Sequence, residues 1–109
     1  MAGDRNVFVG HADADDWEPD DETGGLMHVI RTDGGLEVGL WRAGSLAGST
    51  IELTLDANET ILVTAGSGTL QVDDASPIEL RPGVIVSMTK GARTTWIVDD
   101  AFRELWVYS

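Results

Sequence analysis

Residues 53–96 read LTLDANETILVTAGSGTLQVDDASPIELRPGVIVSMTKGARTTW, and glycine, proline or aspartate marks nearly every corner of this stretch. Between the corners, apolar and polar residues alternate. In the segment that leads into it, Ile51, Leu53 and Leu55 fall on one face and the polar residues on the other. Short alternating segments separated by turn residues predict β-strands rather than helices.

The same pattern extends to both sides of this stretch. Strands are expected over residues 27–31, 36–41, 49–55, 60–63, 69–72, 78–80, 84–88, 94–98 and 102–108. Asp33-Gly34-Gly35 is a hairpin signal between the first two. Many short strands at near-regular spacing, without helical periodicity, predict a closed or sandwiched all-β fold.

The alternation also predicts which side chains face the core. The expected inward set is Ile51, Leu53, Leu55, Ile61, Val63, Leu70, Val72, Leu80, Ile85, Trp96, Val98 and Leu105. Trp41 and Trp106 are expected either inside or at a subunit contact. A chain of 109 residues with 42% hydrophobic residues is large enough for one core and one domain.

The charge balance is strongly acidic, with 19 Asp and Glu against 7 Lys and Arg and a formal net charge of -12. Such a surface repels nucleic acid and anionic membrane, so neither is an expected partner. Many of the acids lie in residues 1–25, which we interpret as a solvated acidic N-terminal arm. Within it, Val7-Phe8-Val9 is a short possible edge strand. Residues 26–109 are expected to form the barrel domain.

The composition narrows the chemistry and the compartment. The chain has no cysteine, which excludes disulfides and thiolate chemistry. No apolar stretch approaches the roughly 20 residues that span a bilayer, and no basic-then-apolar leader opens the sequence. A cytoplasmic protein is therefore expected.

Several short motifs occur in a particular order: Glu59 before Gly66, then Pro82-Gly83, then Gly91 before Trp96, then Phe102-Arg103-Glu104-Leu105-Trp106. In this order and spacing, residues 40–108 resemble the cupins. The resemblance is to the small single-domain branch that includes ureidoglycine aminohydrolase-like and ethanolamine-utilisation proteins. It implies a double-stranded β-helix, the RmlC-like jelly-roll barrel.

The resemblance also implies where a divalent metal would be bound, by two histidines, a glutamate and a third histidine. The histidine pair falls on Leu53 and Leu55 (the other spacing gives Glu52 and Thr54), and the third histidine falls on Thr94. Of the usual ligands, Glu59 alone remains. Zinc, manganese and iron sites need about three or more protein donors, so no metal is expected. Glu59 and His28 are the weak candidates for one.

The ligand pocket is expected at the barrel mouth, lined by Leu53, Leu55, Glu59, Met88, Thr94 and Trp96. Glu59 is the candidate catalytic residue, a general base whose pKa an apolar barrel would raise. The alternative is a turn residue that is solvated or paired with Arg93 or Arg103.

These features favour a cupin without metal or other cofactor that binds a small molecule, or serves as a structural or regulatory module, and is not an enzyme. The alternative is a metal-dependent, aminohydrolase-like cupin enzyme that uses manganese, zinc or iron on a small nitrogenous or carboxylated metabolite. Both readings predict a homodimer, because an open jelly roll leaves sheet edges to cover.

Overall fold

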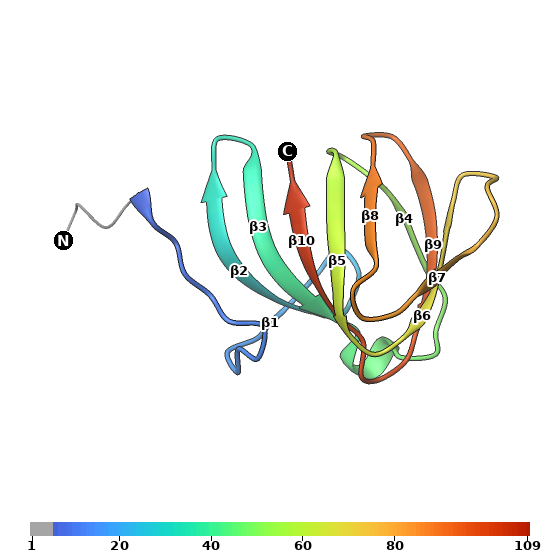
Figure 1. Cartoon of the computed structure of the whole chain (residues 1–109), viewed down its shortest axis with the longest axis horizontal. Coiled ribbons are helices and arrows are strands. Elements are labelled where there is room, and N and C mark those ends of the chain that lie inside the picture. Colours follow the sequence, from blue (N-terminus) through green and yellow to red (C-terminus); the bar gives the residue numbers. More distant parts are fainter. Residues whose placement is uncertain (1–5) are drawn as a thin grey trace.

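The computed structural model describes residues 6–109, and this part of the chain contains ten strands and a short 3₁₀ turn at Gly44–Leu46 (Figure 1). The strands are β1 (Glu18–Pro19), β2 (Leu26–Asp33), β3 (Leu36–Arg42), β4 (Ile51–Thr54), β5 (Glu59–Ala65), β6 (Gly68–Val72), β7 (Ile78–Leu80), β8 (Ile85–Met88), β9 (Arg93–Val98) and β10 (Arg103–Tyr108). The predicted all-β fold is confirmed. Each of the nine predicted strands is present, with ends that differ by a few residues.

The strands form two antiparallel sheets. One has six strands in the order β1-β2-β3-β10-β5-β8, and the other has four in the order β4-β9-β6-β7. Figure 1 shows the larger sheet across the left and centre of the view and the smaller sheet on the right. The chain crosses between the two sheets several times, for example from β5 in the larger sheet directly to β6 in the smaller one. The two sheets therefore enclose one core.

The core consists of inward side chains from both sheets. Its largest fully buried members are Phe102, Ile61, Leu70, Leu80, Val63 and Val98. Full burial of a side chain of this size stabilises the fold by roughly 1.5–3 kcal/mol.

Two residues that were expected to face the core do not. Ile85 is 67% exposed, while its neighbours Val84 and Val86 pack against the core. In β10, Leu105 is only half-buried, and Glu104 next to it is buried. Glu104 and Trp106 are buried and alternate along β10 with half-buried Arg103, Leu105 and Val107, so the inward face of this strand is the one opposite to Leu105.

The N-terminal segment also differs from the expectation. Val7-Phe8-Val9 forms no strand, and the Arg31 guanidinium lies 5.1 Å from the centre of the Phe8 ring. The edge of the larger sheet is instead β1, which pairs with β2. Trp17, just before β1, contacts the guanidinium groups of Arg42 and Arg103. The part of the acidic arm nearest the barrel is therefore attached to it. None of the helical turns in residues 6–109 is long and apolar enough to cross a membrane.

Candidate functional site: an acidic, aromatic cavity

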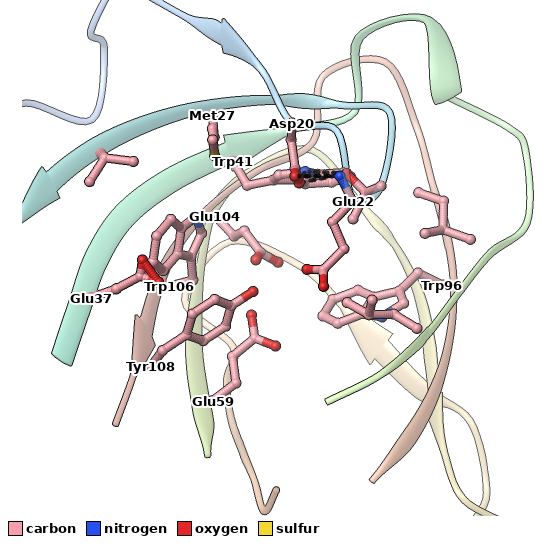
Figure 2. A pocket seen from close by; sticks show the side chains of 14 residues that line it. Asp20, Glu22, Met27, Glu37, Trp41, Glu59, Trp96, Glu104, Trp106 and Tyr108 are labelled. Carbon is pink, nitrogen blue, oxygen red and sulfur yellow. Dashed lines mark hydrogen bonds between the residues drawn. The ribbon is translucent and has the colours of Figure 1, made fainter. Parts of the chain in front are cut away.

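A partly enclosed cavity of about 220 Å³ lies between the sheets at the mouth of the barrel (Figure 2). Acidic and aromatic side chains dominate its wall. The lining residues are Asp20, Glu22, Thr23, Met27, Val29, Glu37, Trp41, Ile51, Leu53, Glu59, Trp96, Glu104, Trp106 and Tyr108. An adjoining hollow of about 240 Å³ shares Glu22, Glu37, Leu53 and Tyr108 with it.

Strand β10 supplies one side of the cavity through Glu104, Trp106 and Tyr108, which share one face because side chains alternate along a strand. The ladders on both sides set their neighbours. Tyr108 pairs with Glu37 on β3 and with Glu59 on β5. The phenol therefore lies in a row between two carboxyl-bearing residues.

The Trp106 indole depends on a missing side chain in the next strand. Gly39 is the residue opposite Trp106, and a Cβ there would lie 2.6 Å from the Trp106 Cζ2 atom. The indole therefore occupies space that any other residue would fill. It also stacks on Tyr108, with ring centres 4.8 Å apart.

The turn from Asp20 to Gly25 closes the cavity from above. Within it, the Thr23 hydroxyl donates to Asp20 Oδ2 at 2.7 Å and the Gly24 N–H donates to the Asp20 carbonyl at 2.7 Å. Trp41 Nε1–H donates to both Asp20 Oδ2 (3.1 Å) and Thr23 Oγ1 (3.0 Å), which attaches the turn to β3. Figure 2 shows the Glu22 side chain pointing from this turn toward Glu59.

Two of the carboxyl groups are buried without a hydrogen-bond partner among residues 6–109. Glu59 and Glu104 are each 4% exposed, and each has a buried Oε1 atom that accepts no hydrogen bond in the described part of the chain. Burial, with a further contribution from the charge of Glu22, raises the pKa of Glu59 to about 7. Burial raises the pKa of Glu104 as well, and the charge of Glu59 adds to the effect.

The neighbouring acids respond to the same surroundings. Burial raises the pKa of Glu22, and the charge of Asp20 contributes. Burial and then the charge of Glu59 raise the pKa of the Tyr108 phenol above its usual range. At neutral pH the cavity therefore holds protons on carboxyl groups that would be ionised in water.

The structure brings together three of the six predicted pocket residues: Leu53, Glu59 and Trp96 line the cavity. Leu55 is buried in the core and lines the adjoining hollow rather than the cavity itself. Met88 is buried opposite Glu59 on β8 and is not part of the wall.

Thr94 supports the wall from behind. Its hydroxyl donates to the Leu53 carbonyl at 2.6 Å and accepts from Trp96 Nε1–H at 2.8 Å. The second hydrogen bond satisfies the N–H of the Trp96 indole, and the ring lines the cavity.

The expectation that Glu59 is solvated, or paired with Arg93 or Arg103, is wrong. The carboxyl is buried, Arg93 lies 3.8 Å from Asp73, and Arg103 lies 3.9 Å from Asp13. The Glu59 side chain is buried because it lies on the same face of β5 as Ile61 and Val63, both of which are buried.

His28 does not join Glu59. Its Nδ1 atom lies 3.0 Å from the Asp16 carbonyl, beside Trp17, and it is not among the residues of the cavity wall. On β2 the cavity receives Met27 and Val29, which alternate with His28.

Sequence reasoning missed two important acids, Glu104 and Glu22. A signal for Glu104 was available, because Phe102, Trp106 and Tyr108 share its position in the alternation and large aromatic side chains favour the interior. Glu22 had no such signal. Its position depends on hydrogen bonds from Trp41, about twenty residues along the chain.

Residues 33–105 match the EutQ-like cupin domain. The chain belongs to this family. Solved structures agree at the level of the fold. A protein described as ethanolamine utilization protein Q from Salmonella typhimurium LT2 is 14% identical with a TM-score of 0.71, over 84% of this chain and 76% of that one.

Two further structures resemble this EutQ-like cupin. The Clostridium difficile EutQ protein is 19% identical with a TM-score of 0.59, over 77% of this chain and 63% of its own. An RmlC-like cupin with a double-stranded β-helix fold from Methanocaldococcus jannaschii is 14% identical with a TM-score of 0.67, over 94% and 88%. The predicted double-stranded β-helix is thus confirmed. No curated protein matches the chain in sequence.

The residues of this EutQ-like cupin do not fit the divalent metal that cupin barrels often hold. At the two histidine positions, Leu53 lines the cavity and Leu55 is in the core, and the Thr94 hydroxyl is committed to two protein hydrogen bonds. No group of three or more His, Cys, Asp and Glu side chains in residues 6–109 has an arrangement that could hold a metal ion.

Proposed function

We propose that this cupin binds a small molecule in the cavity at the barrel mouth. The observation that carries the proposal is the pair of buried carboxyl groups in the cavity wall, Glu59 and Glu104, each with an Oε1 atom that has no hydrogen-bond partner within residues 6–109. An unsatisfied buried polar group costs about 1–3 kcal/mol, more when it is charged. A fold that keeps two such groups against one cavity is arranged to complete them with something that enters it.

The size and the wall of the cavity support the same function. Pockets for drug-sized ligands measure about 300–1,000 Å³, so a cavity of about 220 Å³ suits a smaller metabolite. Trp96 and Trp106 supply apolar contact area, and the carboxyl groups supply orientation. This combination of an apolar wall and a few converging polar groups is typical of ligand sites.

The four tryptophans allow a direct test, since Trp41, Trp96 and Trp106 line the cavity and Trp17 lies outside it. Each indole N–H gives one signal in a ¹⁵N–¹H spectrum, assigned with Trp→Phe variants. Protein is titrated with amines, carboxylates, polyols and nucleobases while thermal stability is recorded.

A cavity ligand is expected to shift the three lining indole signals, leave the Trp17 signal in place, and raise the melting temperature. If the compounds leave all three lining signals unchanged and give no stabilisation, the proposal fails. A structural or regulatory role of the barrel would then be favoured.

A further inference from the structure

We infer that the ligand of this cavity is a small organic ammonium ion, whose N–H groups donate to the carboxyl groups of Glu59 and Glu104. The inference rests on the proposed function, because it names the chemical class of the molecule that the cavity binds. Charge, aromatic surface and the available hydrogen-bond acceptors each support it.

The charged groups of the wall are all acidic. Asp20, Glu22, Glu37, Glu59 and Glu104 line the cavity, and among its lining residues in the described part of the chain there is no Lys, Arg or His. An anionic ligand would meet repulsion from several sides with no cation to offset it. A cation would meet attraction in a partly desolvated site, where electrostatic interactions are stronger than in water.

The carboxyl groups of Glu59 and Glu104 can both accept hydrogen bonds from an ammonium group. The buried Oε1 atoms of Glu59 and Glu104 accept no hydrogen bond within residues 6–109. An ammonium group carries up to three N–H donors and no acceptor, which matches two carboxyl groups in one cavity wall. Figure 2 shows the carboxyl groups of Glu22, Glu59 and Glu104 reaching toward the same space from a turn and two strands.

The aromatic rings provide the surface that an organic cation needs. Trp96, Trp106 and Tyr108 border the space that the carboxyl groups face. A cation near the face of an indole or phenol ring is attracted by the ring quadrupole, most strongly by Trp. The rings also cover the alkyl part of an ammonium ion, whereas they offer nothing to a bare metal ion, whose ligands are oxygen, nitrogen or sulfur atoms.

The binding reaction includes a proton. The titratable groups that face Glu59 are Tyr108 and Glu104 on β10, Glu37 on β3, and Glu22 and Asp20 on the turn; β4, β8 and β9 present apolar or indole side chains there. Since these neighbours are all acidic, the empty cavity holds protons near neutral pH. A bound ammonium ion supplies the positive charge instead, so one carboxyl proton leaves for the buffer as the cation enters.

The test compares three compounds with four carbons and different head groups: n-butylammonium, 1-butanol and butyrate. Calorimetric titrations at pH 6 in two buffers with different ionisation enthalpies measure the proton released per bound molecule. The indole signals of Trp41, Trp96 and Trp106 show whether binding takes place in the cavity.

The expected result is that butylammonium alone binds there and releases about one proton. Below pH 7 its affinity should therefore rise by about tenfold for each unit that the pH increases. Glu59→Gln and Glu104→Gln each weaken this binding at least tenfold, and Glu59→Gln also reduces the proton release. Glu52→Gln, on the exposed face of β4, is the matched control and leaves binding unchanged.

Other outcomes overturn the inference in distinguishable ways. If butanol or butyrate shifts the three lining indole signals and butylammonium does not, the cavity binds small molecules but not this class. If magnesium, calcium or manganese ions shift those three indole signals and bind more tightly than butylammonium, the cavity is a metal site. If butylammonium and the broader set of compounds all leave the three signals unchanged, the proposed function fails with the inference.

Discussion

Trp106 packs against Gly39, its partner across the β3–β10 ladder, and the distance from the Trp106 Cζ2 atom to a Cβ built on Gly39 is only 2.6 Å. The same Cβ would lie 2.9 Å from the His28 carbonyl. The wall of the cavity therefore depends on a residue that has no side chain. A substitution at Gly39 therefore moves the Trp106 indole without replacing any residue of the cavity wall.

Gly39→Ala is expected to destabilise the protein by about 1–3 kcal/mol, because the added methyl group overpacks a filled site. Urea denaturation measures the loss. The double variant Gly39→Ala/Trp106→Phe serves as the control, since Phe lacks the atom that clashes and should recover part of the stability. If the two substitutions are additive, the indole does not occupy the space over Gly39.

The free energy of unfolding is expected to fall as pH rises from about 4.5 to 7. Glu59 binds its proton more tightly in the folded chain, because burial raises its pKa from 4.5 to about 7. The folded protein therefore holds more protons than the unfolded chain in this window, and stability decreases with pH. For Glu59 the change corresponds to about 3 kcal/mol, and Glu104 contributes in the same direction.

Glu59→Gln removes this penalty, so the variant is expected to be more stable than the parent protein at pH 8 and to show a flatter pH profile. Urea denaturation at several pH values from 5 to 8 measures both. Glu52→Gln, in an exposed position, should leave the profile unchanged. A Glu59→Gln protein that is less stable than the parent at pH 8 would mean that the carboxylate has a stabilising partner.

Asp99 is expected to show the opposite pH dependence. Its carboxylate accepts hydrogen bonds from the Ser67 hydroxyl (2.9 Å), the Ser67 N–H (3.2 Å) and the Ala101 N–H (3.1 Å), and the Ser67 hydroxyl contributes most to lowering its pKa. The stabilisation is present above the ordinary pKa of 3.8 and is lost as pH falls through the lower folded value.

Asp99→Asn should therefore lower the melting temperature at pH 7 and have a smaller effect near pH 3. Asp100→Asn, at the exposed neighbouring position, is the control. An equal loss at both pH values would attribute the effect to the shape of the turn rather than to the charge of Asp99.

Thr94→Val tests the support behind Trp96. Valine has the shape of threonine but leaves the buried Trp96 Nε1–H and the Leu53 carbonyl without their partner, at a cost of about 1–3 kcal/mol. The Trp96 indole signal should move with the change, while Thr95→Val, on the other face of β9, should leave it in place. If stability and the Trp96 signal are both unaffected, water replaces the hydroxyl.

The sheets could be predicted from the sequence because strand alternation and turn residues are local signals. Glu59 and Trp96 were placed at the cavity through the order of short motifs that resembles the cupins. The inward face of β10 was assigned wrongly because Leu105 was taken as the apolar position, although the aromatic residues Trp106 and Tyr108 lie on the opposite face and Glu104 shares that face with them. Ile85 was a different error: it cannot share a face with Met88, three residues later, on one extended strand.

The turn of residues 20–25 was beyond prediction for another reason. Its acids resemble those of any solvated segment, and its place at the barrel mouth depends on the Trp41 indole, which is distant in the sequence. Contacts of this kind are determined by the complete fold and not by the local pattern.

That turn lies outside the matched region of residues 33–105, yet it carries Glu22 over the cavity floor that β5 and β10 provide. The floor and the roof of the chamber thus come from separate stretches of chain. Substitution of a few residues in this turn would change which ligand is bound while leaving both sheets intact. Barrels that superimpose closely can in this way differ in what they carry.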